Sequence, residues 1–344
     1  MFESICLKLR SLKDYRRGPV DHPLNGLLMI VLIGNIAGCR GWDAIADWGR
    51  AQYNTLKQYL VLGKKPASAD TYRRAIEAYN LTAFFEAMDV LDGEIHFDGK
   101  RAKGANINGS VHHFIEALAG NKVIGMVETG PGAEGPGIIK LLAALNISGK
   151  LITIDAAGTT PAVVSEITRK GGDYLIALEP NQPSLLNRTK QAFSEHSPRK
   201  YKVKNNGHGR FETRTSQTIC DPEIINSVSS YSAIDGIRSI CCIVRTRVTK
   251  DGIETTSHYH ISSRRLSARQ YARIVRSHWS IEAMHHVLDV SLNEDLCRIC
   301  NSAGAVGFIR RFAYSVISEI KGRLSFRRFS EIMRANPILV LKML

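Results

Sequence analysis

Residues 94–100 read EIHFDGK, a short strand-like run that reaches an aspartate, Asp98. Residues 151–156 read LITIDA, a second such run, which reaches Asp155. Because an unpaired charge is costly inside a buried strand, carboxylates in these places predict a site that uses them. A third carboxylate, Glu282, follows in the stretch HWSIE at residues 278–282. Acidic groups that a fold gathers from distant segments favour binding of hard divalent cations.

The composition is that of a globular protein with a polyanionic partner. The chain has 344 residues, of which 44% are hydrophobic and 23% are charged. That length suits roughly two domains of about 150 residues each. Lysine and arginine outnumber the acids by 46 to 32, and the net charge of +14 favours nucleic acid or an anionic membrane surface.

A membrane location is disfavoured by the sequence. The longest apolar run, residues 24–37, is interrupted by polar residues and glycines and is shorter than the ~20 residues that span a bilayer. Residues 1–10 lack a long apolar stretch followed by a cleavage site, so no secretory signal is expected. The seven scattered cysteines suit free thiols in a reducing cytoplasm.

The first quarter of the chain is predicted to be helical, and we assign residues 1–92 to an N-terminal helical domain. Apolar residues recur with helical spacing from residue 24, around Trp42 and after Pro66. Three short helices of this kind suit either a helix-turn-helix-like DNA module or an ordinary helical bundle, and the periodicity does not separate the two.

From residue 93 the pattern predicts an α/β core, whose first part is residues 93–180. Three strands in succession are followed by alternating helices and strands, which is typical of an α/β sandwich. The predicted strands are 95–98, 112–119, 122–128, 151–155 and 174–178, and the predicted helices are 138–145 and 161–170. Gly120-Asn121 is the expected hairpin turn between the second and third strands.

Residues 181–265 are predicted to form a β-rich insertion. A polar helix follows Asn181-Gln182-Pro183, and residues 199–214 are expected to form a basic loop. Two alternating runs, 237–249 and 255–261, are expected to pair as antiparallel strands.

Residues 266–344 are expected to complete the core, beginning with a long helix over residues 267–292. Tyr271, Val275, His278 and Glu282 fall on one face of that helix. We expect this face to pack beside the strands that carry Asp98 and Asp155.

The chain resembles the H-repeat-associated transposases of bacterial insertion sequences, which belong to the DDE group and have a ribonuclease-H-like catalytic core. The resemblance runs in order over most of the chain. The matching segments are HPL (22–24), DGK (98–100), TIDA (153–156), GGDY (171–174), NQP (181–183), HGRFETR (208–214), HWSIE (278–282), LDV (288–290) and ED (294–295). It implies a mixed sheet flanked by helices, with the β-rich insertion between the second Asp and the Glu.

By the same resemblance, Asp98, Asp155 and Glu282 are the catalytic triad and the ligands of two Mg²⁺ ions, for which Mn²⁺ can substitute. The implied reaction is metal-dependent cleavage and transfer of DNA strands at the ends of an insertion sequence. The implied partners are double-stranded DNA, as terminal inverted repeats and as target, and a second copy of the chain on paired ends. The implied location is the cytoplasm of a bacterium, at the nucleoid, with no membrane contact.

Basic side chains near the carboxylates are candidates for contacts with DNA phosphates. Lys100, Arg101 and Lys103 follow the first aspartate, and Arg210 and Arg214 lie in the predicted basic loop. A solvated charged loop is nearly as good an interpretation of the last two. His278 is assigned to DNA by the resemblance, and Trp279 is expected to fill core.

Departures from the family pattern keep other functions open. Ala283 follows Glu282 where the family usually has Asn, and residues 132–135 (GAEG) replace a family Lys-Ser-Asn-Glu stretch. The main alternative is therefore a catalytically inactive or repurposed DNA-binding descendant of such a transposase. A different nucleic-acid hydrolase on the same fold is a third reading. A di-iron site at Glu282 and His285, which have Glu-x-x-His spacing, is a distant fourth.

Overall fold

The computed structural model describes residues 13–14, 16, 20–77, 93–107, 110–207, 210–230, 232–250, 252–300 and 302–342. The chain divides into two compact units. The sheet unit consists of Val90–Gly99 and Ala133–Ile281. The helical unit consists of Met1–Asp89, Lys100–Gly132 and Glu282–Leu344. One strand, β1, and one helix, α10, contribute residues to both units.

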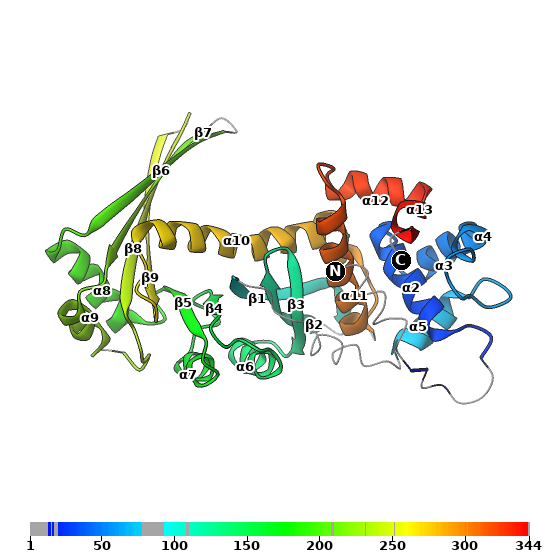
Figure 1. Cartoon of the computed structure of the whole chain (residues 1–344), viewed down its shortest axis with the longest axis horizontal. Coiled ribbons are helices and arrows are strands. Elements are labelled where there is room, and N and C mark those ends of the chain that lie inside the picture. The colour runs from blue at the N-terminus through cyan, green and yellow to red at the C-terminus, as the bar shows by residue number, and fades with distance from the viewer. Residues whose placement is uncertain are drawn as a thin grey trace. The chain divides into compact units, whose positions relative to one another are not determined.

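The sheet unit is built on one mixed sheet with the strand order β1-β4-β5-β9-β8-β7-β6 (Figure 1). Its strands are β1 (Glu94–Ile107, of which the first six residues belong to this unit), β4 (Leu151–Ile154), β5 (Asp173–Leu178), β6 (Arg199–Gly207), β7 (Arg210–Ile219), β8 (Ser239–Thr249) and β9 (Gly252–Ser262). β4 runs parallel to β1 and β5 runs parallel to β4, whereas β9, β8, β7 and β6 continue the sheet with antiparallel pairs.

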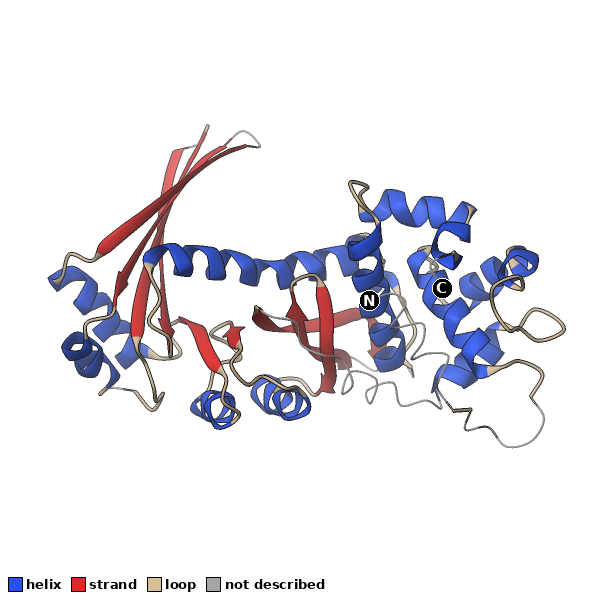
Figure 2. Cartoon of the chain, viewed as in Figure 1, coloured by secondary structure: helices blue, strands red, loops and turns tan. Residues whose placement is uncertain are grey.

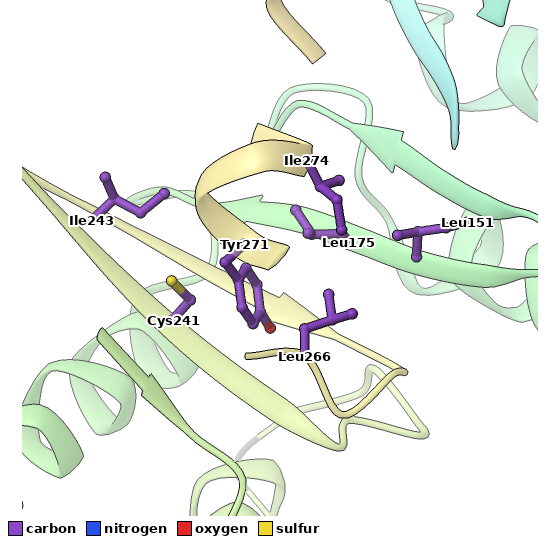
Figure 3. Packing of buried hydrophobic residues seen from close by; sticks show 7 residues of the cluster. All are labelled: Leu151, Leu175, Cys241, Ile243, Leu266, Tyr271 and Ile274. Carbon is purple, nitrogen blue, oxygen red and sulfur yellow. The ribbon is translucent and has the colours of Figure 1, made fainter. Parts of the chain in front are cut away.

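An apolar cluster fills one face of this sheet beneath the first turns of α10 (Ala268–Val290), as Figure 3 shows. Tyr271 and Ile274 of the helix pack against Leu151 of β4 and Leu175 of β5. Period-2 alternation places Leu151 and Thr153 of β4 on this same face, and the alternation continues to Asp155, directly after the strand. The buried face of the sheet therefore continues past its apolar part toward Asp155.

The remaining helices of the sheet unit are α6 (Glu134–Ala144), α7 (Pro161–Arg169), α8 (Pro183–Glu195) and α9 (Pro222–Ser229). Proline opens α7, α8 and α9, where the first helical turn leaves its N–H groups unbonded in any case. The Thr160 side chain caps α7 and the Asp221 side chain caps α9, each by accepting from backbone N–H groups. These caps fix where the helices begin beside the sheet.

The helical unit packs short helices around one that is buried on almost every side (Figure 2). Its helices are α2 (Leu24–Ile36), α3 (Trp42–Ala51), α4 (Tyr53–Leu56), α5 (Ala69–Glu77), the end of α10, the 3₁₀ turn η2 (Glu294–Leu296), α11 (Ala303–Ile320), α12 (Phe326–Ala335) and α13 (Ile338–Leu341). α2 is apolar all round and contacts α3, α5, α11 and α12, which is how such a helix avoids water. The rest of β1, β2 (Ser110–Ala119) and β3 (Lys122–Thr129) complete the unit, with β2 and β3 antiparallel.

The predicted mixed α/β fold, a sheet flanked by helices, is confirmed. Within the sheet unit, β4 runs parallel to β1 and β5 runs parallel to β4, with α6 and α7 in the connections between them. The predicted pair of strands around residue 250 and the predicted long helix are present as β8, β9 and α10.

Three local predictions were wrong. β1 does not end at Asp98 but continues to Ile107, so Asp98-Gly99 is strand and not a turn. Residues 199–207 and 210–214 lie in strands β6 and β7, whereas Arg210 and Arg214 were assigned to a basic loop. Trp279 is not core, because 45% of its surface is exposed. These outcomes depend on strand pairing and on which side of α10 faces the sheet, and a local pattern does not contain either.

Within the described residues, no helix is long and apolar enough to cross a membrane. Six cysteines are described, at positions 39, 220, 241, 242, 297 and 300, and all six are free thiols, as predicted.

Candidate functional site

Asp98 and Asp155 come from neighbouring parallel strands. The register pairs Phe97 of β1 with Ile154 of β4, and the two aspartates are the next residues along each strand. Adjacent strands lie about 4.8 Å apart, so the two backbones hold these side chains next to each other on one face of the sheet. Asp98 is half-buried and Asp155 is exposed, so neither carboxylate bears the full desolvation cost of a buried charge.

The turn after β4 holds Asp155 in place. The backbone N–H of Gly158 donates to Oδ1 of Asp155 at 3.0 Å, and the Thr159 hydroxyl donates to the Asp155 carbonyl oxygen at 2.7 Å. A Cβ atom at position 158 would lie 2.6 Å from Cδ1 of Ile138, so a larger residue there would require the Ile138 side chain to shift. Asn181 donates its side-chain N–H to the Ala156 carbonyl oxygen at 2.8 Å, which gives the Asn-Gln-Pro segment a structural role in this turn.

A buried polar layer separates the apolar cluster from the carboxylates. The Thr153 hydroxyl lies 2.7 Å from Nδ1 of His96 on β1 and 2.7 Å from Nδ1 of His278 on α10. Burial, and next the neighbouring His278, lowers the pKa of His96 to about 4, so this imidazole is neutral at pH 7. Sequence reasoning found His278 but missed His96 and Thr153. The only local signal was a polar residue in the middle of each apolar run.

Glu282 lies on α10 one turn beyond His278, with its side chain exposed. The part of α10 that belongs to the helical unit begins at Glu282. Asp98 and Asp155 belong to the sheet unit. The described contacts of Thr153, His278 and the apolar cluster hold the preceding turns of α10 on the sheet face that bears the two aspartates.

Lys100, predicted to contact DNA, is instead buried inside the helical unit. Its side chain is 6% exposed, and its ammonium lies 2.5 Å from Asp289 and 3.7 Å from Glu294. Burial raises the pKa of Asp289, and the hydrogen bond from Lys100 opposes that rise. Because its charge is already neutralised by two carboxylates, we assign Lys100 a structural role in joining β1 to α10.

The same buried network continues to α11. Arg311, fully buried, donates to both Glu116 of β2 and Glu294 of η2, and Nε2 of His285 lies 3.1 Å from Glu116. Burial alone would raise the pKa of Glu116, but the charge of Arg311 and the contact with His285 lower it to about 2. His285 is thus a partner of Glu116, which removes the basis for a di-iron site with Glu282.

The other predicted DNA contacts differ in accessibility. Arg101 is exposed, and Lys103 has a side chain that is 72% exposed with Asp295 at 3.5 Å. Arg214 lies on β7 and forms an ion pair with buried Glu212. The side chain of Arg210, like residues 208–209, lies outside the described part.

The exposed side of α10 adds an aromatic and cationic pair that sequence analysis did not assign. The Arg276 guanidinium lies 5.9 Å from the centre of the Trp279 ring. The exposed tryptophan is therefore held under a positive charge.

The donor set at Asp98 and Asp155 fits Mg²⁺. In the part of the chain that the structure describes, no three His, Cys, Asp or Glu side chains lie close enough to hold one metal ion. Mg²⁺ does not require such a cage, because it keeps several waters and takes one or two carboxylates together with substrate phosphate oxygens. Two adjacent aspartates with exposed or half-exposed oxygens supply that kind of ligand.

Comparison with known proteins places this geometry in a family. A family model described as Transposase DDE domain matches residues 91–314, and one described as DDE_Tnp_1-associated matches residues 7–89. YbfL of Escherichia coli K12 is 31% identical over 90% of this chain and 88% of its own length. The H repeat-associated protein YhhI of the same organism is also 31% identical, with the same coverage.

Among solved structures, the chain is similar to a chain of the piggyBac transposase synaptic complex with hairpin DNA. The TM-score is 0.42 and the identity is 10%, over 99% of this chain and 77% of that one. The match of the Transposase DDE domain to about two thirds of the residues, together with relatives alike over nearly their full length, establishes that this chain belongs to the Transposase DDE domain family.

Proposed function

We propose that this protein is a DDE-type transposase that cleaves and joins DNA strands at the ends of an insertion sequence. The observation that supports this most is that Asp98 and Asp155 directly follow the last paired residues of β1 and β4, two adjacent parallel strands whose apolar face packs against α10. A pair of acidic groups at the end of a ribonuclease-H-like sheet is of little use for packing. It suits phosphoryl transfer, where positioning and electrostatic stabilisation supply most of the catalysis.

In this proposal Asp98, Asp155 and Glu282 hold two Mg²⁺ ions, which Mn²⁺ can replace. These three carboxylates would be the protein's ligands to the ions. The chemistry that two such ions supply is activation of the attacking oxygen and stabilisation of the leaving oxygen. The contacts Thr153–His278 in the sheet unit and Lys100–Asp289 in the helical unit support the inclusion of Glu282, because each joins α10 to a strand next to a proposed ligand.

The proposed substrate is double-stranded DNA, as the terminal repeats of the element and as the target, bound by two copies of the chain on paired ends. The net charge of +14 supports a polyanionic partner. Arg101 and Lys103 are the predicted phosphate contacts whose exposure suits the role. A catalytically inactive, DNA-binding descendant is the second candidate, and the departure from the family pattern at Ala283, next to Glu282, is what favours it.

The test is cleavage of a plasmid that carries the DNA flanking this gene, with Mg²⁺ or Mn²⁺, by wild type, Asp155→Asn and Asp235→Asn. Asp235 is exposed in the same unit, so its substitution controls for loss of one negative charge. We expect cuts at the element boundaries with wild type and Asp235→Asn, and none with Asp155→Asn. Binding without metal-dependent cleavage by the wild type would contradict the proposal and support the inactive descendant.

A further inference from the structure

Thr153 is a polar residue in β4, a buried strand whose other residues are apolar. Its neighbours in the strand are Leu151, Ile152 and Ile154, and all four residues are buried. Valine would fill the same space and has a high propensity for strands. A threonine that is 1% exposed in this setting must gain something from its hydroxyl, since burial without a hydrogen bond is costly.

The hydroxyl is bonded to two imidazoles at once. Nδ1 of His96 and Nδ1 of His278 each lie 2.7 Å from Oγ1 of Thr153, and the two rings meet edge to face with centres 5.7 Å apart. A hydroxyl has one proton to donate and accepts through its lone pairs. When both rings are neutral, one Nδ1 accepts that proton and the other donates its own, so the tautomers of the two histidines are coupled through Thr153.

These three residues lie next to the proposed metal ligands on each element. His96 is two residues before Asp98, and Thr153 is two residues before Asp155. His278 precedes Glu282 by one helical turn on the same face. A single buried hydroxyl thus joins the two strands and the helix that carry the proposed ligands.

We infer that Thr153 is a positioning residue of the proposed cleavage site, and that it acts by holding His96 and His278 so that β1, β4 and α10 keep their relative register. The inference rests on the proposed function. It assigns Thr153 no contact with metal or DNA. Outer partners of metal ligands orient them, and their loss typically lowers metal affinity or activity about 10- to 100-fold.

The experiment compares wild type, Thr153→Val and Thr153→Ser. Valine keeps the volume and removes the hydroxyl, whereas serine keeps the hydroxyl and removes a methyl group. Mn²⁺ affinity is measured by calorimetric titration of the protein bound to a DNA duplex of the element end. The ¹⁵N chemical shifts of the histidine rings report the tautomers.

We expect Thr153→Val to fold, to bind Mn²⁺ about 10-fold or more weakly, and to lose the fixed tautomers of His96 and His278. Thr153→Ser should retain wild-type affinity and tautomers. Equal Mn²⁺ affinity in wild type and Thr153→Val would overturn the inference and leave the proposed function standing. Equal weakening by both variants would overturn it as well, since the cause would be packing. Absence of Mn²⁺ binding by the wild type would overturn both proposals.

Discussion

His260 on β9 is a buried side chain whose two ring nitrogens have no hydrogen-bond partner among the described residues. It lies on the same sheet face as His278, two strands beyond Asp155 in the register. Burial, followed by the nearby His258 and His278, lowers its pKa to about 3. A buried imidazole without a hydrogen-bond partner lowers the free energy of unfolding, so packing alone does not explain a histidine at position 260.

Replacement of His260 by leucine should therefore stabilise the protein. At pH 7 we expect the free energy of unfolding to rise by about 1–2 kcal/mol, the cost of an unsatisfied buried polar group. The folded-state pKa lies below the ordinary 6.5, so the unfolded chain binds a proton that the folded protein excludes. Above pH 6.5, protonation of His260 in the unfolded chain costs the folded protein no stability. As the pH falls from 6.5 toward 3, that protonation lowers the free energy of unfolding of the wild type. The gain from leucine should therefore be larger at pH 5.

Urea unfolding of wild type and His260→Leu at pH 5 and pH 7.5 measures this gain. The same substitution at exposed His196 provides the control and should show no comparable gain. A destabilised His260→Leu variant would mean that the imidazole has a hydrogen-bond partner in solution.

The residues of the candidate site divide clearly into those that sequence patterns find and those that they do not. Asp98 and Asp155 were found because each follows a strand-like run, and Glu282 was found by its place on one face of the predicted helix and by the family resemblance. The bond between His96 and Thr153 joins positions 57 apart, and the bond between Thr153 and His278 joins positions 125 apart. Such pairs depend on strand register and on how a helix lies on the sheet, which no local period specifies.

At the scale of the elements, the sequence predicted the helices and strands whose hydrophobic periodicity agrees with their burial. β8 and β9 were both predicted, from two runs with the alternation of antiparallel strands. β6 alternates Lys200, Lys202 and Lys204 with Tyr201 and Val203. The basic, glycine- and asparagine-rich composition of residues 199–214 nevertheless led to the interpretation of a loop. β6 is a strand because its whole length pairs with β7. Lysines on an edge strand also prevent pairing with other chains, which explains a composition that resembles a loop.

The buried ion network joins β1, β2, α10, η2 and α11 of the helical unit, so Arg311→Met should destabilise that unit strongly. Loss of Arg311 leaves Glu116 and Glu294, which are 0% and 2% exposed, without their main cation. Removal of one partner from such a buried pair costs about 3–5 kcal/mol. Arg327→Met is the matched control, because that side chain is 84% exposed, and its cost should stay within about 0.5 kcal/mol.

Chemical denaturation at pH 7, followed by circular dichroism, compares the two arginine variants. An Arg311→Met protein as stable as wild type would show that Glu116 and Glu294 become neutral or hydrated at little cost. The assignment of this network as the support of the β1–α10 junction would then be wrong.

At the scale of the whole molecule, the excess of 14 positive charges predicts DNA binding that weakens steeply with salt. Each phosphate that the protein neutralises on duplex DNA contributes a slope of about −0.9 to log K against log salt. Lys100 adds little to this, because Asp289 and Glu294 hold its charge inside the fold. The slope therefore reports exposed cations such as Arg101, and net charge alone does not determine it.

Arg101→Gln and Arg327→Gln separate these two contributions, because each removes one positive charge from an exposed side chain. If Arg101 contacts a phosphate, its loss should make the slope shallower by about 0.9 and weaken binding similarly for all sequences. Arg327→Gln should leave the slope of the wild type unchanged, since its guanidinium bonds to Glu331. Binding of a fluorescent duplex of the element end, titrated from low to physiological salt, gives the slopes. Equal slopes for all three proteins would exclude Arg101 from the DNA contact and leave only a general attraction by charge.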